Sequence, residues 1–285
     1  VCCTLKTGIK MRFSGKVVIV TGSNSGIGKA TALLMAKEGA SVVIHGRDLK
    51  TLEQAVRECK EVGSKTAKFP MVQGDFDCDK TLIQRLYETA MKEFGRIDVL
   101  VNNACIAESC TLKTVTEGQF DTRMNVAVKA PIFLSQKCFP ELKKNKGNIV
   151  NVSSMSGIRP QALGYEMYAV AKAALNQFTQ CAGIEYGSEG VRVNAVCPGV
   201  TKTNIAIKSG LVKEGEEDFL PKWAPAVPLK KVSVPEDSAK LIAFLASDDA
   251  SMMNGALVVQ DGGHTLMGLD TQTIENAAKY SGHLK

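Results

Sequence analysis

The sequence lacks the features of a membrane-spanning, disordered or nucleic-acid-binding chain. No apolar run approaches the roughly 18–20 residues of a membrane-spanning helix. No block of about five like charges occurs, and the net charge of +6 is interpreted as a contribution to solubility rather than as a basic binding face. The apolar share of 45% and the charged share of 22% are ordinary for a globular protein. We therefore expect a soluble protein with neither membrane nor nucleic-acid partners.

Paired cysteines and clustered histidines are also absent. The chain has 9 cysteines, an odd number, and none of them forms a C-x-x-C pair. A disulfide framework is therefore not expected, and the chain is interpreted as reduced and intracellular, with a cytoplasmic location. The 3 histidines, His45, His264 and His283, lie far apart in the sequence. No ligand spacing connects them, so no metal site is predicted.

Short apolar strands alternate with helical patterns along the chain. Strands are predicted at 17–20, 41–44, 68–73, 97–101, 148–152, 191–196 and 256–259. Helices are predicted at 29–38, around 52–59, 82–94, about 119–144, about 164–187 and from Pro235 onward. Apolar strands joined by helices indicate a parallel sheet that is covered on both faces. The fold prediction is a single-domain, doubly wound α/β fold of the Rossmann type, with a seven-stranded parallel sheet over residues 11–265.

Three segments fall outside this regular pattern. Residues 1–10 precede Met11, have no long apolar core, and are interpreted as an N-terminal extension that is either upstream or artificially added sequence. The stretch 201–233 contains several Gly and Pro residues and is predicted to be a substrate loop or lid. The tail 266–285 is predicted either to pack on a neighbouring subunit or to be a frayed end.

A glycine-rich turn follows the first predicted strand and precedes a helix. Its sequence is Thr21-Gly22-Ser23-Asn24-Ser25-Gly26-Ile27-Gly28. Glycines allow a tight turn and a close approach of the backbone to a ligand, and a helix N-terminus attracts a diphosphate. Because the turn lies where a dinucleotide fold needs it, we expect a dinucleotide cofactor to contact Gly22, Ser23, Ser25, Gly26, Ile27 and Gly28.

The end of the second strand bears on the choice of cofactor. An acidic residue at this position accepts hydrogen bonds from a ribose with a free 2′-hydroxyl, but here Gly46 is followed by Arg47. Arginine offers a planar fork of donors to a phosphate, so Arg47 is predicted to bind the 2′-phosphate of NADP(H). In the alternative, Arg47 is a surface charge and Asp48 binds the ribose of NAD, although Asp48 also suits the N-cap of the next helix.

A tyrosine and a lysine lie four residues apart on a predicted helix. Tyr168 and Lys172 therefore share one face, and a nearby cation favours the ionised phenol. Tyr168 can then exchange a proton with a carbonyl or alcohol oxygen. Tyr165 has no lysine four residues later. Serines follow the fifth strand, and the count leaves Ser153, Ser154 and Ser156 open, although the Ser-Ser-x-x-Gly pattern favours Ser154.

These motifs together resemble the short-chain dehydrogenase/reductase family, of the type with T-G-x-x-x-G-x-G and Y-x-x-x-K, over residues 12–265. The resemblance implies catalytic roles for Asn125, Ser154, Tyr168 and Lys172, with Asn125 holding a water in a proton relay. It implies further cofactor contacts from Asp75, Phe76, Asn102, Ala104, Tyr168, Lys172, Pro198, Gly199, Val200 and Thr203. Asp261-Gly262-Gly263 resembles a structural closing motif. Position 105 is Cys where the family has Gly.

The function predicted from these residues is that of an NADP(H)-dependent carbonyl reductase or alcohol dehydrogenase. The apolar residues of 201–233 indicate a fairly apolar small-molecule substrate. The resemblance implies a homo-oligomer, either a dimer or a tetramer. One alternative is an NAD-dependent alcohol or steroid dehydrogenase. The non-enzyme alternative is a cofactor-bound scaffold or redox sensor.

Overall fold

The computed structural model describes residues 11–106, 108–159, 164–203, 205 and 223–267. The predicted extension 1–10, most of the substrate loop and nearly all of the tail lie outside these residues. Within them, all strands belong to one seven-stranded sheet in the order β3-β2-β1-β4-β5-β6-β7. Every neighbouring pair of strands is parallel. The strands are β1 (Val17–Val20), β2 (Ser41–Gly46), β3 (Met71–Gln73), β4 (Val99–Asn102), β5 (Asn148–Val152), β6 (Arg192–Pro198) and β7 (Leu257–Gln260).

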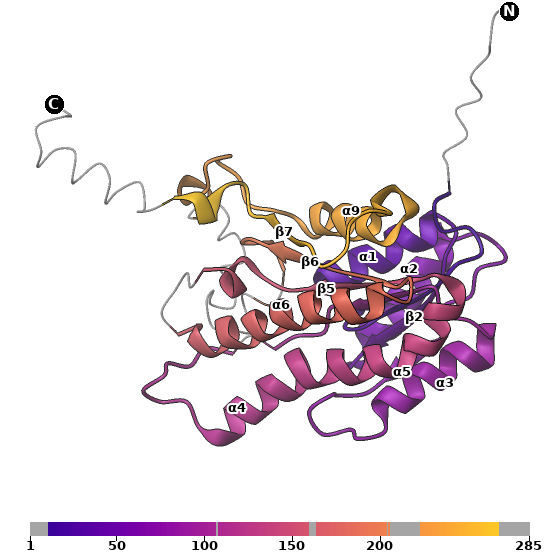
Figure 1. The fold of residues 1–285 in the computed structure, drawn as a ribbon, viewed down its shortest axis with the longest axis horizontal. Coiled ribbons are helices and arrows are strands. Elements are labelled where there is room, and N and C mark those ends of the chain that lie inside the picture. Colours follow the sequence, from indigo (N-terminus) through magenta and orange to yellow (C-terminus); the bar gives the residue numbers. More distant parts are fainter. Residues whose placement is uncertain (1–10, 107, 160–163, 204, 206–222, 268–285) are drawn as a thin grey trace, which may run out of the picture.

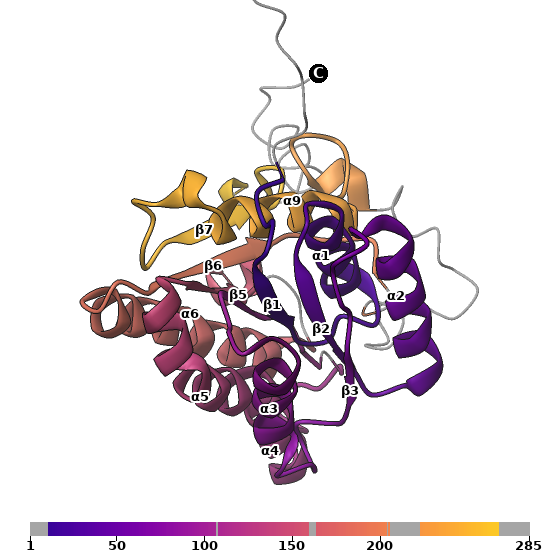
Figure 2. The same cartoon turned by 90° about the vertical axis from the view of Figure 1, so that its right-hand side faces the viewer.

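Helices cover both faces of the sheet (Figure 1). The α-helices are α1 (Gly26–Lys37), α2 (Leu49–Val62), α3 (Leu82–Phe94), α4 (Glu117–Met124), α5 (Ala130–Asn145), α6 (Glu166–Gly187) and α9 (Pro235–Ala246). Short 3-10 turns are found at Met155–Gly157, Ala224–Ala226, Asp248–Ala250 and His264–Leu266. Figure 2 shows α1, α2 and α9 on one side of the sheet and α3, α4, α5 and α6 on the other. Each side has its own cluster of buried apolar side chains, which confirms the doubly wound prediction.

The predicted elements are all present, with differences at their ends. The third strand begins only at Met71, after Pro70, which has no N–H to donate to a sheet. The fourth strand begins at Val99 rather than at 97. The stretch predicted as one helix over 119–144 is three consecutive helical segments, because a π-helix, η1 (Asn125–Lys129), separates α4 from α5. Helix α4 begins earlier, at Glu117, where Thr116 and Gln119 form a capping box.

The sheet order identifies the edge at which a ligand can bind. Strand β1 lies between β2 and β4, and successive strands are added on one side of β1 up to β3 and on its other side from β4 onward. The loops after β1 and β4 therefore lead to opposite faces of the sheet and leave a crevice between them. The loops that follow the carboxyl ends of β1, β2, β4, β5 and β6 therefore meet at one edge. Across the described ranges, no helix is both long enough and apolar enough to cross a membrane.

Candidate active site

The glycine-rich turn connects β1 to α1 and presents the start of that helix. Gly22 has φ +63° and Gly26 has φ +54°, a region that favours glycine. A Cβ on Gly28 would lie 2.4 Å from the carbonyl oxygen of Gly22, so the turn folds directly against the helix. Ser25 is the N-cap residue, and no side chain in the described residues caps the first turn of α1. Its backbone N–H groups thus suit an anionic ligand.

His45, at the end of β2, ties the glycine-rich turn to the loop after β3. Its Nδ1 accepts a hydrogen bond from the backbone N–H of Gly22 at 3.0 Å, and its Nε2 lies 3.2 Å from the carbonyl oxygen of Gly74. The backbone N–H of His45 donates to the hydroxyl of Ser23, which in turn donates to Val20. Burial lowers the pKa of His45 to about 4. The ring is therefore neutral, and it fixes the relative positions of the two loops.

Arg47 and Asp75 face each other across the ends of β2 and β3. Nη1 of Arg47 is 3.2 Å from Oδ2 of Asp75, and 53% of the Arg47 side chain is exposed. Asp48 is the N-cap of α2 and accepts a hydrogen bond from the backbone N–H of Thr51 at 2.8 Å. Phe76 packs against the His45 ring with 4.9 Å between centroids. An exposed guanidinium therefore stands at the cavity rim, while Asp48 stabilises a helix start.

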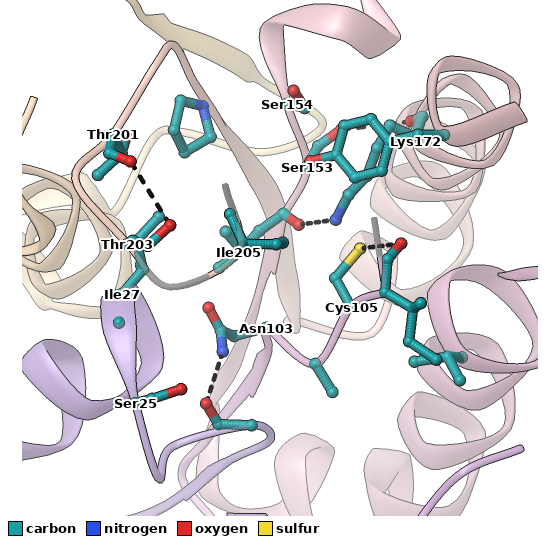
Figure 3. A pocket seen from close by; sticks show the side chains of 18 of the residues that line it. Ser25, Ile27, Asn103, Cys105, Ser153, Ser154, Lys172, Thr201, Thr203 and Ile205 are labelled. Carbon is teal, nitrogen blue, oxygen red and sulfur yellow. Dashed lines mark hydrogen bonds between the residues drawn. The ribbon is translucent and has the colours of Figure 1, made fainter. Parts of the chain in front are cut away.

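Tyr168, Lys172 and Ser154 come together where α6 passes the end of β5. The Lys172 side chain is 2% exposed, and its Nζ donates to the carbonyl oxygen of Val152 at 2.7 Å (Figure 3). That Nζ lies 5.6 Å from the centre of the Tyr168 ring. Burial raises the pKa of Tyr168, while the charge of Lys172 and a hydrogen bond with Ser154 oppose this effect. Tyr168 is thus a protonated phenol with a cation and a hydroxyl beside it.

The neighbouring serines have different partners. The hydroxyl of Ser153 donates to the backbone carbonyl of Lys172 at 3.2 Å, so this hydroxyl already has a partner within the protein. The hydroxyl of Ser154 accepts from the backbone N–H of Ser156, and it acts to lower the pKa of Tyr168. Of the three serines left open by the sequence, Ser154 is therefore the one that acts on the phenol.

Asn125 is the first residue of the π-helix η1, and its side chain contacts a carboxylate. Its Nδ2 donates to Asp77 at 3.1 Å, and Thr122 donates to the same carboxylate at 2.9 Å. Asn125 does not line the cavity. Its backbone carbonyl accepts the hydrogen bond from Ala130 that defines the π-helix. The structure thus brings Ser154, Tyr168 and Lys172 together, whereas the Asn125 carboxamide is hydrogen-bonded to Asp77.

The segment after β6 forms the opposite wall. Pro198, Gly199, Val200 and Thr203 all line the cavity. A Cβ on Gly199 would lie 2.7 Å from the Cα of Asp261, so this wall is packed against the closing motif. The carboxylate of Asp261 accepts hydrogen bonds from the backbone N–H groups of Gly263 and Thr265. These contacts agree with a structural role for the closing motif.

One cavity of about 620 Å³ joins these parts, a volume within the usual range for small-molecule sites. Most of the residues expected to contact the cofactor line it. Ser23 and Asn102 do not. The Ser23 hydroxyl is tied to the backbone, and the Asn102 carboxamide contacts Ser135 and Asn151 in the buried core. Gly28 lies behind the turn and acts through packing.

Several cavity residues were missed by the sequence reasoning. They are Asn24, His45, Asn103, Cys105, Ile106, Met155 and Tyr165, whereas Ile205 and Trp223 belong to the predicted substrate loop. Asn103 rather than Asn102 supports the glycine-rich turn, because its Nδ2 donates to the carbonyl oxygens of Thr21 and Gly22. A polar residue at the end of a buried strand was the available signal for His45. In the described part of the chain, no group of His, Cys, Asp or Glu could hold a metal ion.

Comparisons with known proteins agree with this arrangement. Residues 22–265 match the family model described as enoyl-(acyl carrier protein) reductase. The chain is 36% identical to a 3-oxoacyl-(acyl-carrier-protein) reductase from Thermotoga maritima, over 89% of this chain and 99% of that protein. It is 36% identical to a short-chain dehydrogenase/reductase of unknown function from Caenorhabditis elegans, solved with cofactor, with a TM-score of 0.82 over 90% of this chain and 98% of that one. A short chain dehydrogenase from Burkholderia cenocepacia in complex with NADP is 29% identical, with a TM-score of 0.80 over 89% of this chain and 99% of that one.

Proposed function

This chain belongs to the short-chain dehydrogenase/reductase family and is an oxidoreductase, and we propose that it transfers hydride between NADP(H) and the carbonyl or secondary-alcohol carbon of a fairly apolar small molecule. The observation that carries the proposal is that Ser154, Tyr168 and Lys172 line the same cavity as the uncapped start of α1 and Arg47. A reacting group and a nucleotide diphosphate can thus be held side by side. The glycines of the turn let it pack closely against Asn103, Ala104 and Thr203, which brings the start of α1 to the cavity.

In this proposal Tyr168 is the general acid and base. It donates its proton to the carbonyl oxygen during reduction and recovers it from the alcohol during oxidation. When bound, the nicotinamide ring supplies or accepts the hydride. Ser154 orients the substrate oxygen, and Lys172 binds the ribose and adjusts the pKa of Tyr168. Because the Asn125 carboxamide is engaged with Asp77, we assign Asn125 a positioning role in the proton relay rather than contact with substrate.

The preference for NADP(H) rests on Arg47. Its guanidinium carries five N–H donors, and the single contact with Asp75 leaves donors for a 2′-phosphate. The NAD alternative assigns the ribose to Asp48, but the Asp48 carboxylate already accepts the N–H of Thr51 at the start of α2. The NADP complex of the Burkholderia relative supports the same assignment.

The apolar part of the cavity supports the substrate class. Ile106, Met155, Ile205 and Trp223 line it together with Tyr165. A ketone with an aliphatic or aromatic substituent fits such a wall better than a charged acid does. Exposed apolar side chains on three helices support a homo-oligomer, because such side chains are typical of subunit contacts. They are Phe120 on α4, Phe133 on α5 and Val170 on α6.

The cofactor part is tested by fluorescence titration of the full chain with NADPH and with NADH. We expect wild type to prefer NADPH, and Arg47→Ala to weaken NADPH binding by about ten- to a hundredfold with little effect on NADH. Arg57→Ala is the matched control, because Arg57 is an exposed arginine on α2 that does not line the cavity. Equal binding of the two cofactors by wild type would exclude the NADP(H) assignment.

The catalytic part is tested with the same protein and a panel of aliphatic and aromatic ketones, by following NADPH consumption. Tyr168→Phe keeps the ring but removes the exchangeable proton, so we expect turnover to fall by about a hundred- to ten-thousandfold while NADPH still binds. Unchanged turnover in Tyr168→Phe would refute the role of Tyr168. Cofactor binding by wild type without turnover of any ketone or alcohol would favour the scaffold or redox-sensor alternative.

A further inference from the structure

Gly46, the last residue of β2, faces the side chain of Asn24 from the glycine-rich turn. A Cβ on Gly46 would lie 2.5 Å from Cγ, 2.7 Å from Cβ and 2.7 Å from Oδ1 of Asn24, and these are the three nearest atoms. The φ of Gly46 lies outside the left-handed region, so its backbone conformation is open to other residues. The nearest obstacle to a side chain at position 46 is therefore Asn24.

Asn24 is fixed in this place by contacts on two sides. Its Nδ2 donates to Oγ1 of Thr51 in the first turn of α2 at 2.9 Å. Thr51 is in turn bound to Asp48, because its backbone N–H donates to the Asp48 carboxylate at 2.8 Å. On the other side, the backbone N–H of Ser23 donates to the carbonyl oxygen of His45 at 2.7 Å, which binds the turn to β2. Rotation of the Asn24 side chain could move Cγ and Oδ1, but its Cβ can move only with the backbone.

We propose that Asn24 is a specificity-determining residue for the cofactor, because it occupies the space that an acidic side chain at position 46 would need. Asn24, Gly46 and Arg47 all line the cavity. A carboxylate at position 46 would accept a hydrogen bond from a free 2′-hydroxyl and repel a 2′-phosphate. The Asn24 carboxamide is uncharged and adds no negative charge beside Arg47. The inference rests on the proposed function, in which Arg47 binds the 2′-phosphate.

The preference for NADP(H) then depends on two positions that are coupled by direct contact. Gly46→Asp alone should not create a site for NAD, because the new side chain would push the glycine-rich turn away from β2. That turn leads into the uncapped start of α1, which suits the diphosphate that both cofactors share, so both should bind less well. Removal of the whole Asn24 side chain opens the space. The effects of the two substitutions should therefore be far from additive.

The test measures binding of NADPH and of NADH by fluorescence titration of the full chain, together with its melting temperature. The variants are Gly46→Asp alone, Asn24→Gly alone, and Gly46→Asp combined with either Asn24→Gly or Asn24→Ala. Alanine is the matched control for glycine, because it keeps the Cβ of residue 24, which would lie 2.7 Å from a Cβ at position 46. Asn24→Gly alone controls for the added freedom of the turn.

We expect Gly46→Asp to melt below wild type and to bind both cofactors weakly. Added Asn24→Gly should bring the melting temperature close to that of Asn24→Gly alone. It should also tighten NADH binding by about ten- to a hundredfold relative to Gly46→Asp, the range for a hydrogen bond to a charged group. Added Asn24→Ala should restore little of either. If Gly46→Asp does not fold, the melting temperatures are compared with Gly46→Ala in its place, because that change introduces only the Cβ.

Three results would overturn the inference. They are tight NADH binding by Gly46→Asp with an unchanged melting temperature, no gain in NADH binding when Asn24→Gly is added, and equal rescue by Asn24→Ala and Asn24→Gly. Equal binding of NADPH and NADH by wild type would instead overturn the NADP(H) assignment of the proposed function. The comparison of the double variants with Gly46→Asp still decides the role of Asn24 in that case, because it uses NADH alone.

Discussion

The backbone N–H of Gly22 donates a hydrogen bond to Nδ1 of His45 at 3.0 Å. Because Nδ1 accepts, the ring proton is carried by Nε2, which donates to the carbonyl oxygen of Gly74. One neutral imidazole thus connects the turn after β1 with the loop after β3. Protonation would place an N–H against the N–H of Gly22 and break this contact.

We predict that His45 makes stability depend on pH in a defined window. Burial lowers its pKa to about 4 in the folded protein, below an unfolded value of about 6.5. The contribution is therefore fully present above pH of about 6.5 and is lost as the pH falls through about 4, a change of about 3 kcal/mol in the free energy of unfolding. Urea unfolding of wild type and His45→Asn at several pH values measures it. If the two proteins lose stability in parallel across this window, the assignment to His45 is wrong.

Substitution of Gly28 should disrupt the turn. A Cβ there would lie 2.4 Å from both the Gly22 carbonyl oxygen and the Asn103 side chain, so backbone must shift. We expect Gly28→Ala to lower the melting temperature and to weaken NADPH binding. Gly118→Ala is the control, because Gly118 is also helical but meets nothing within 4 Å. That change should raise stability by up to about 1 kcal/mol, and a similar loss in both variants would contradict the steric argument.

Two adjacent asparagines should respond differently to substitution. Asn102 donates to Ser135 and Asn151 in the core, so Asn102→Ala leaves buried acceptors unpaired and should cost about 1–3 kcal/mol of stability. Asn103 supports the carbonyl groups of the glycine-rich turn and lines the cavity, so Asn103→Ala should chiefly weaken NADPH binding. Thermal unfolding and fluorescence titration of both variants measure this. A loss of NADPH binding in Asn102→Ala together with a loss of stability in Asn103→Ala would instead place Asn102 in the cofactor site.

The cysteines should differ in their reactivity toward iodoacetamide. Burial raises the pKa of Cys59 and Cys138 to about 12 and that of Cys197 to about 11, so these thiols should stay unmodified in the native protein. Cys78 and Cys181 are exposed and should react whether or not cofactor is present. Cys105 should react slowly, and NADPH should protect it. Peptide mass spectrometry after timed labelling measures each site, and labelling of Cys105 at equal rates with and without NADPH would place it outside the cofactor site.

The regular part of the fold could be predicted because hydrophobic periodicity reports it directly. The apolar runs of β1 and β5, and the glycine-rich turn, identify both the sheet and the ligand edge. Side-chain direction at strand ends was not accessible in the same way. Asn102 and Asn103 are consecutive and chemically identical, and only the tertiary structure sends one into the core and the other to the turn. The contact of Asn125 with Asp77 likewise joins residues far apart in the sequence, so no local pattern reports it.

The π-helix at Asn125–Lys129 also changes which side chains of α4 and which of α5 face the interior of the protein. Each residue of an α-helix turns the chain by about 100°, so one extra residue within a turn rotates everything beyond it by about that angle. Helix α4 thereby directs Arg123 into the protein, while α5 independently directs Leu134, Cys138 and Leu142 toward the sheet. Deletion of a single residue between 125 and 129 would restore regular α-helical hydrogen bonding and misalign one of these two faces. The length of this segment is therefore constrained even where its individual side chains are interchangeable.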